Sequence, residues 1–136
     1  SFLYAQLLAS EKILFERKKI WDMYHKSFKE LEEKGKLIRH FIPDYNNNNA
    51  HMYYILLNNS NQRDLFIKKM SNKGIECTFH YLPLHLSKYG DKFSKNNSLS
   101  ITENIAERIV RLPLWLGDGL NQDYIIEKSI EIIQSF

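Results

Sequence analysis

The residues best suited to chemistry stand close together within residues 74–85, in the sequence GIECTFHYLPLH. His80, Tyr81 and His85 surround Pro83 there, directly after a run that predicts a strand. Imidazole and phenol groups both donate and accept hydrogen bonds, and strand ends that open into loops commonly carry binding residues. We therefore expect these side chains either to bind a polar ligand or to hydrogen-bond the backbone of their own loop.

A metal site is poorly supported by this pattern. His80 and His85 are five residues apart with a proline between them, and neither has a cysteine or carboxylate at a ligand-like spacing. Since a protein-bound zinc needs three or four converging ligands, we expect none here. The sequence also contains no glycine-rich phosphate loop, nucleophile elbow or catalytic carboxylate pair.

Three more polar residues stand near predicted strands. His51 follows an asparagine-rich turn and precedes an apolar strand, where a histidine that bonds to backbone is the simplest interpretation. Arg108 and Arg111 carry the charge needed to bind a carboxylate or a phosphate. Ion pairs with Glu103 or Glu107 would explain both arginines without any ligand.

The composition is that of a globular domain. The 136 residues are 43% hydrophobic and 26% charged, which excludes wholesale disorder and fits one domain. The net charge of +3 is mild and lysines are mixed with glutamates, so we expect no nucleic-acid surface. Apolar runs are too short for a membrane span. Cys77 is the only cysteine, which fits a reducing, cytoplasmic location.

The predicted elements define an α+β fold with a small sheet of three to four strands and helices mainly on one face. Apolar residues three, four and seven apart predict a helix over much of residues 2–34, which Gly35 ends. Three more helices are expected to start at Asn59 or Ser60, at a capping box of Ser100 and Glu103, and at Asn121, and Gly74 is expected to end the first of them. Strands are expected at residues 50–57, 75–79 and 111–115, with a short extended piece at 37–42 and a polar loop at 86–97.

The first helix is long for such a small domain. Its apolar stripe exceeds what the rest of the chain is expected to cover, so we expect part of it to face something outside the chain. We therefore divide the chain into a long N-terminal helix at residues 1–35, leading from a large domain that the chain lacks, and a small domain at residues 36–136. A start at Ser1 without methionine is also expected of a piece of a longer protein.

Three blocks of the sequence resemble one enzyme family. NAHMYYILL at residues 49–57, GIECTFHYLPLH at 74–85 and AERIVRLPLW at 106–115 are similar, in this order, to the C-terminal part of the DegT-type sugar-nucleotide aminotransferases. Among these, the blocks are most similar to the dTDP-4-oxo-6-deoxyglucose transaminases of the WecE (RffA) group. The early stretch YAQLLASEKILFERKKIWDMYHKSF resembles the long helix with which that family leaves its large domain.

The resemblance implies the small C-terminal domain of a pyridoxal-phosphate (PLP) enzyme of the aspartate-aminotransferase, type I fold. Such enzymes work as homodimers and move an amino group from glutamate to a keto sugar nucleotide, here of the dTDP-4-oxo-6-deoxyhexose type. In this family the Schiff-base lysine and the phosphate-binding residues lie in the large domain, and no lysine of this chain matches that motif. The resemblance therefore implies a chain without catalytic residues of its own, inactive alone.

The resemblance also assigns the site residues. His80 and Tyr81 match family positions that face the sugar-nucleotide site, and His85 matches the second histidine of the same motif. Asn49 and His51 match the block before the first strand, where a supporting role is expected. An alternative of another class is a stand-alone, non-catalytic module that binds sugar nucleotides or regulates. A nucleic-acid binder is more distant, because basic and aromatic residues are not concentrated on one element.

Overall fold

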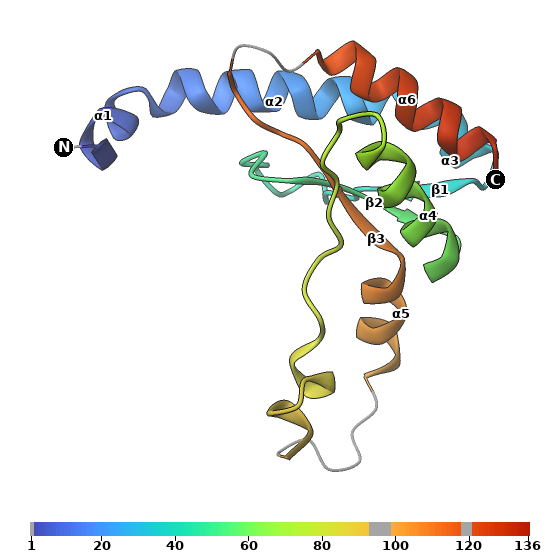
Figure 1. Cartoon of the computed structure of the whole chain (residues 1–136). Coiled ribbons are helices and arrows are strands. Elements are labelled where there is room, and N and C mark those ends of the chain that lie inside the picture. The colour runs from blue at the N-terminus through green and yellow to red at the C-terminus, as the bar shows by residue number, and fades with distance from the viewer. Residues whose placement is uncertain (1, 93–98, 118–120) are drawn as a thin grey trace.

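The computed structural model describes residues 2–92, 99–117 and 121–136. Its elements follow the chain as helices at the start, a small sheet in the middle and a helix at the end (Figure 1). In order they are α1 (Phe2–Leu8), α2 (Ser10–Ser27), α3 (Lys29–Glu33), β1 (Leu37–Arg39), β2 (Tyr53–Leu57), α4 (Ser60–Ser71), the 3₁₀ turns η1 (Leu84–Leu86) and η2 (Gly90–Lys92), α5 (Ser100–Arg108), β3 (Ile109–Leu112) and α6 (Gln122–Gln134).

Within the described residues the sheet has three antiparallel strands in the order β1-β2-β3. Tyr54 of β2 lies opposite Arg111 of β3. On its outer side β3 gains one isolated bridge, in which Arg111 N–H donates to the Thr78 carbonyl at 2.7 Å and Thr78 N–H donates to the Arg111 carbonyl at 3.3 Å. The bridge places residues 76–80 along the β3 edge of the sheet.

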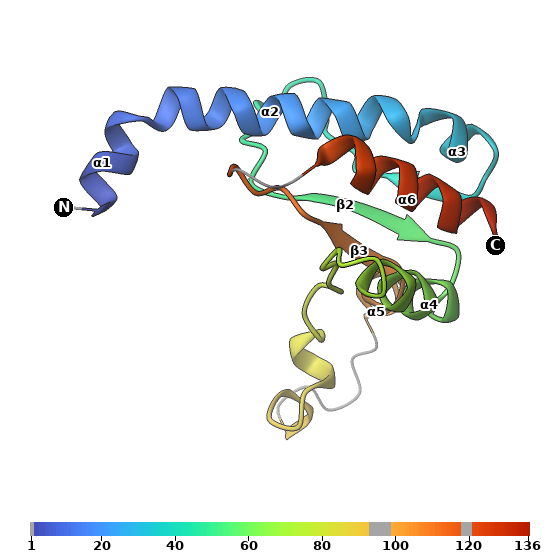
Figure 2. The same ribbon diagram turned by 45° about the horizontal axis from the view of Figure 1, so that its top comes forward.

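One face of the sheet carries the core. Alternate residues of β2 (Tyr53, Ile55 and Leu57) are fully buried, while Tyr54 and Leu56 are only partly buried. Helices α2, α3, α4 and α6 all contribute apolar side chains to this core, and α2 and α6 run along the same side of the sheet (Figure 2). Their buried residues are Trp21, Tyr24, Phe28, Leu31, Phe66, Met70, Ile125, Ile126, Ile132 and Ile133. The expected α+β fold with helices mainly on one face is confirmed.

The opposite face of the sheet is referred to below as the open face. Successive side chains of a strand point to opposite sides, so this face carries Ile38, Tyr54, Leu56, Ile109 and Arg111. Ile109 is buried, and the other four are exposed or only partly buried. Polar and charged side chains on this face are therefore accessible to a ligand.

Several helix ends occur where the sequence predicts them. Gly35 and Gly74 take positive φ angles of 67° and 75°, which glycine adopts without a Cβ penalty, and each ends a helical segment. Asn59 accepts a hydrogen bond from Gln62 N–H, and Asn121 accepts one from Tyr124 N–H. These four predicted boundaries are confirmed because they depend on local backbone chemistry.

The predicted single helix over residues 2–34 is instead three helical pieces. Ala9 (φ −97°, ψ 7°) separates α1 from α2, and Phe28 (φ −93°, ψ 2°) separates α2 from α3. The Phe28 ring is fully buried and stacks on Tyr24 at 5.8 Å between ring centroids. Side-chain packing thus accompanies the second break, whereas α1 bends away from α2 without burying any residue (Figure 1).

The predicted strand at residues 75–79 is wrong as a regular strand. Ile75 and Cys77 are buried as its alternation predicts, but Thr78 alone forms a bridge. Continuing the register would place Glu76 opposite Pro113, which has no N–H to donate. The burial pattern of a strand therefore exists here without its ladder of hydrogen bonds.

The helix before β3 also differs from its prediction. Leu99, rather than Ser100, is the N-cap residue of α5, and Glu103 Oε1 accepts a hydrogen bond from Leu99 N–H at 3.0 Å, so only the glutamate half of the capping box forms. The predicted polar loop at 86–97 includes residues 93–98, which lie outside the described part of the chain. Among the described helices, none combines the length and apolarity needed to cross a membrane.

Candidate functional site

A row of side chains crosses the open face next to the β3 edge. Directly opposite residues in antiparallel strands project to the same side, about 4.5–5.5 Å apart at Cβ. Tyr54, Arg111 and Thr78 occupy such positions on three neighbouring segments. The Arg111 side chain therefore leaves the sheet between the side chains of Tyr54 and Thr78.

His80 lies beside this row. It follows Thr78 by two residues and lines a pocket of about 570 Å³ together with Ile109, the β3 residue two before Arg111. Its Nδ1 atom is buried and has no hydrogen-bond partner among the described residues. Burial, and then the charges of Arg111 and His51, lower the pKa of the His80 imidazole. The ring is thus neutral at neutral pH, and its exposed part, rather than the buried Nδ1, is what a ligand can contact.

The turn before β2 fixes His51. Asn49 Oδ1 accepts a hydrogen bond from His51 N–H at 3.2 Å and lies 3.0 Å from the His51 Nδ1 atom. Arg17 of α2 donates to the carbonyls of Ala50 at 3.0 Å and His51 at 2.5 Å. Ala50 has a φ of 47°, unusual for a residue with a side chain. These contacts hold a strained turn that presents the exposed His51 ring.

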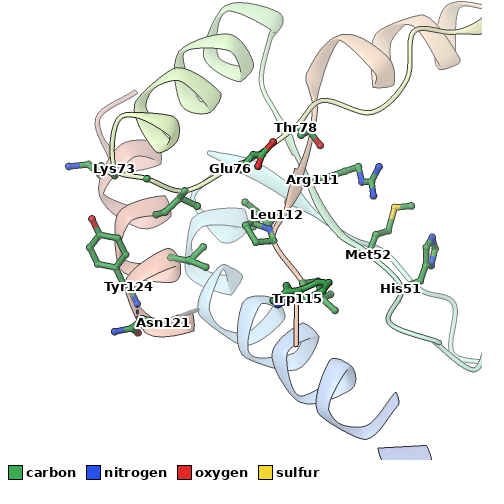
Figure 3. Close-up of a pocket in the computed structure, with 15 residues that line it drawn as sticks. His51, Met52, Lys73, Glu76, Thr78, Arg111, Leu112, Trp115, Asn121 and Tyr124 are labelled. Carbon is green, nitrogen blue, oxygen red and sulfur yellow. Dashed lines mark hydrogen bonds between the residues drawn. The ribbon is translucent and has the colours of Figure 1, made fainter. Parts of the chain in front are cut away.

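A pocket of about 670 Å³ lies between residues 73–78, the edge of β3 and the start of α6 (Figure 3). Arg111 and His51 lie toward one end of it, and Lys73 and Tyr124 toward the other. Trp115 is 69% exposed and lines the same pocket. The pocket thus combines an arginine with exposed aromatic surface.

Arg111 is not used in an ion pair. Within residues 2–92, 99–117 and 121–136, its guanidinium makes no hydrogen bond, ion pair or ring contact. Glu103, one of the two glutamates considered from the sequence, lies 2.9 Å from His85 Nε2 instead. Arg108 donates to the Asn104 carbonyl at 3.4 Å. The ion-pair explanation therefore does not hold for Arg111.

Tyr81 and His85, the other two predicted substrate-binding residues, have different surroundings from His80. Tyr81 is 74% exposed, and its ring meets the His80 ring edge-on with centroids 5.0 Å apart. His85 turns toward Glu103 of α5, away from the Arg111 row. The structure thus brings together His80, Tyr81 and His51 with its support Asn49, and leaves His85 on a separate contact.

Some residues of this site were not found from the sequence. Arg17 lies outside the apolar stripe of the helix predicted over residues 2–34, and nothing in its local sequence indicates that it reaches the turn at Ala50. Tyr54 and Thr78 become neighbours of Arg111 only through the strand register. A correct register could have predicted this row, but a register is a long-range property of the sheet.

Solved structures identify the fold class. TlmJ from Streptoalloteichus hindustanus, an aminotransferase, matches with a TM-score of 0.81 at 21% identity, covering 97% of this chain and 35% of that one. The putative sugar aminotransferase Spr1654 from Streptococcus pneumoniae, in its PMP form, matches at 0.78 and 22% identity over 97% and 33%. Helicobacter pylori PseC, an aminotransferase of pseudoaminic acid biosynthesis, matches at 0.83 and 18% identity over 98% and 36%.

The family follows from the sequence profile. The DegT/DnrJ/EryC1/StrS aminotransferase family matches residues 1–128, and the chain belongs to this family. The chain spans about a third of the length of the solved structures that it matches. The described residues therefore form one part of an aminotransferase fold.

PLP is the cofactor expected from the resemblance, and it needs a lysine for its Schiff base. Every lysine in the described ranges is exposed or only partly buried. In the same ranges no three or more histidine, cysteine, aspartate or glutamate side chains come together as metal ligands. The chemistry that these residues can supply is the binding of a polar or anionic substrate.

Proposed function

We propose that this chain is the small C-terminal domain of a PLP-dependent aminotransferase that moves an amino group from glutamate to a keto sugar nucleotide. The family match over residues 1–128 carries the proposal. Within it, the three sequence blocks favour a dTDP-4-oxo-6-deoxyhexose substrate, as in the WecE group. In this proposal residues 1–35 lead from a large domain, and the whole protein is a cytoplasmic homodimer.

The role proposed for this chain is to bind the sugar nucleotide from one side of the active site. The partly exposed, neutral imidazole of His80 offers a hydrogen bond to a sugar or nucleotide oxygen. Tyr81 adds an exposed phenol next to it. Asn49 holds His51 in a supporting position. His85 is proposed as a third substrate contact, reached when its loop meets the rest of the protein.

The cofactor is proposed to be bound outside residues 1–136, because no lysine of this chain matches the lysine motif of the family. No catalytic residue is therefore assigned here. When bound, PLP supplies the electron sink that amino transfer requires. The chain's own residues bind and orient the substrate.

The test compares the full-length protein with this chain. The full-length protein, given dTDP-4-oxo-6-deoxyglucose and glutamate, should form 2-oxoglutarate and an aminated sugar nucleotide, both measured by mass spectrometry. The 136-residue chain should form neither, and borohydride reduction in the presence of PLP should trap no stoichiometric adduct at one lysine. Turnover by the chain with such an adduct would overturn the proposal. A full-length protein that binds sugar nucleotides but transfers no amino group would support the binding-module alternative.

A further inference from the structure

We propose that Arg111 and His51 form a binding site for an anionic group, a phosphate or a carboxylate, on the open face beside His80. Under the proposed function, two parts of the substrates have this chemistry, the diphosphate of the sugar nucleotide and the carboxylates of glutamate. The choice between them rests on the proposed function. The anion site itself does not.

The first argument is the state of Arg111. Its side chain is partly buried at the edge of the sheet, and its guanidinium has no partner within the described residues. A charge that is partly removed from water without a partner is unfavourable. The planar guanidinium also matches the oxygen pairs of carboxylates and phosphates. A bound oxyanion would supply the missing partner.

The second argument is the arrangement of the neighbouring side chains. The Thr78 bridge holds a hydroxyl-bearing residue next to Arg111, and His80 follows on the same side. His51 lines the same pocket as Arg111 (Figure 3). Its Nδ1–H faces Asn49 Oδ1, so Nε2 can donate a hydrogen bond to an anion when the imidazole is protonated. Arg111 and His51 both act to lower the pKa of the His80 imidazole. Positive potential therefore gathers at this end of the pocket.

The third argument concerns the acidic residues nearby. Glu103 is engaged by His85, and Glu107 of α5 is exposed and pairs with no arginine in the described structure. Glu76 lines the same pocket as Arg111 and is exposed, without an ion pair to it. No described carboxylate of this chain therefore neutralises Arg111, although Glu76 is close enough to weaken anion binding.

The experiment uses the 136-residue chain and two probes at constant ionic strength, inorganic pyrophosphate and glutamate. The histidine ring resonances of His51 and His80 are followed by NMR during each titration. We expect saturable shifts of both rings, with a dissociation constant in the millimolar range. Stronger binding of pyrophosphate would assign the site to the sugar-nucleotide diphosphate, and stronger binding of glutamate would assign it to the amino donor.

Matched variants test whether anion binding depends on Arg111 itself or only on positive charge in this region. Arg111→Met should weaken binding by about tenfold or more, and Arg111→Lys should give an intermediate loss because it keeps the charge without the planar fork. Arg108→Met, the same change three residues earlier, should leave binding unchanged. Glu76→Gln should strengthen it. Each variant's thermal unfolding is compared with the unchanged chain, so that misfolding is recognised.

The inference is overturned if neither probe gives saturable shifts, or if the shifts persist in a folded Arg111→Met variant. The full-length protein distinguishes this failure from a failure of the proposed function. Amino transfer with unchanged KM values in Arg111→Met would reject the anion site alone. Anion binding that depends on Arg111, in a full-length protein without amino transfer, would reject the proposed function alone.

Discussion

The His80 ring combines partial exposure with a buried Nδ1 atom that has no partner in the part of the chain that the structure describes. In the full-length protein, His80→Ala should weaken sugar-nucleotide binding or turnover while the bound cofactor is retained. Loss of one hydrogen bond to a polar ligand costs about 1–3 kcal/mol, or roughly 5- to 150-fold in KM or kcat/KM. Steady-state kinetics and the cofactor's absorbance measure the two effects. Unchanged kinetics in a stably folded variant would make His80 a structural residue.

His40 should make the free energy of unfolding depend on pH. Burial, and then the charges of His25 and His51, lower the pKa of His40 to about 4. In the unfolded chain an imidazole titrates near about 6.5, so between these values the unfolded state binds more protons than the folded one. The stability that neutral His40 contributes is therefore complete above about pH 6.5 and is lost as the pH falls toward 4.

The His40 ring stacks on Tyr54 with centroids 4.1 Å apart. The variant that tests its role is His40→Phe, which keeps an aromatic ring at this position but cannot be protonated. Its free energy of unfolding should fall less steeply on acidification than that of the unchanged chain. The difference should stay below the about 1.4 kcal/mol per pH unit that one full proton gives, because the ring is partly exposed. Urea denaturation at several pH values measures it. Parallel curves would mean that His40 is not the group that titrates.

At the scale of elements, the sequence predicts what local chemistry decides. The caps at Asn59 and Asn121 and the left-handed Gly35 and Gly74 need only their own neighbours. The strand predicted at residues 75–79 does not form a regular ladder of hydrogen bonds. The cause is Pro113 on the neighbouring segment, which has no N–H to donate and is distant in sequence. His80 and Arg111 could both be named as candidates from the sequence, but the position of Thr78 beside Arg111 depends on the register of the sheet.

The contact between α2 and the turn before β2 can be tested in the same way. Arg17 donates to the carbonyls of Ala50 and His51, and Ala50 holds a positive φ there. Arg17→Met should lower the free energy of unfolding by about 1–2 kcal/mol, since hydrogen bonds from a charged donor are lost at a partly exposed site. It should also release His51 from one orientation.

Lys18→Met is the matched control, because Lys18 makes one exposed contact to the Asn47 side chain at 3.1 Å. It should change the free energy of unfolding by less than about 0.5 kcal/mol. Chemical denaturation measures both variants, and the line width of the His51 ring resonance reports its mobility. Equal effects of the two substitutions would mean that Arg17 does not hold the turn.

At the scale of the whole molecule, the described helices do not cover all their own apolar surface. The stripe predicted on the first helix is buried at Trp21, Tyr24 and Phe28 in the second half of α2. Its first half is open, and α1 extends away from the sheet (Figure 1). The exposed large hydrophobic residues there are Phe2, Leu3, Tyr4, Leu7, Leu8, Leu14 and Phe15. The expectation that something outside the chain covers this surface stays a prediction.

The isolated chain should therefore self-associate. Contiguous apolar patches on soluble monomers rarely exceed about 300–600 Å², and burial contributes roughly 25 cal/mol per Å². Seven large apolar side chains on α1 and the start of α2 provide such a patch. Sedimentation over a concentration series should show a reversible dimer or larger species. Leu7→Glu, at a side chain that is 61% exposed, should shift the chain toward monomer without lowering its stability.

Ile101→Glu is the control, since Ile101 on α5 is 76% exposed and belongs to a different surface. It introduces the same charge and should leave the association unchanged if α1 and α2 form the contact. The two variants together separate loss of a specific apolar surface from a general effect of added negative charge. A chain that stays monomeric at high concentration, with the amide of Leu7 protected from hydrogen exchange, would show that α1 folds back onto its own domain and that no outside surface is needed to cover it.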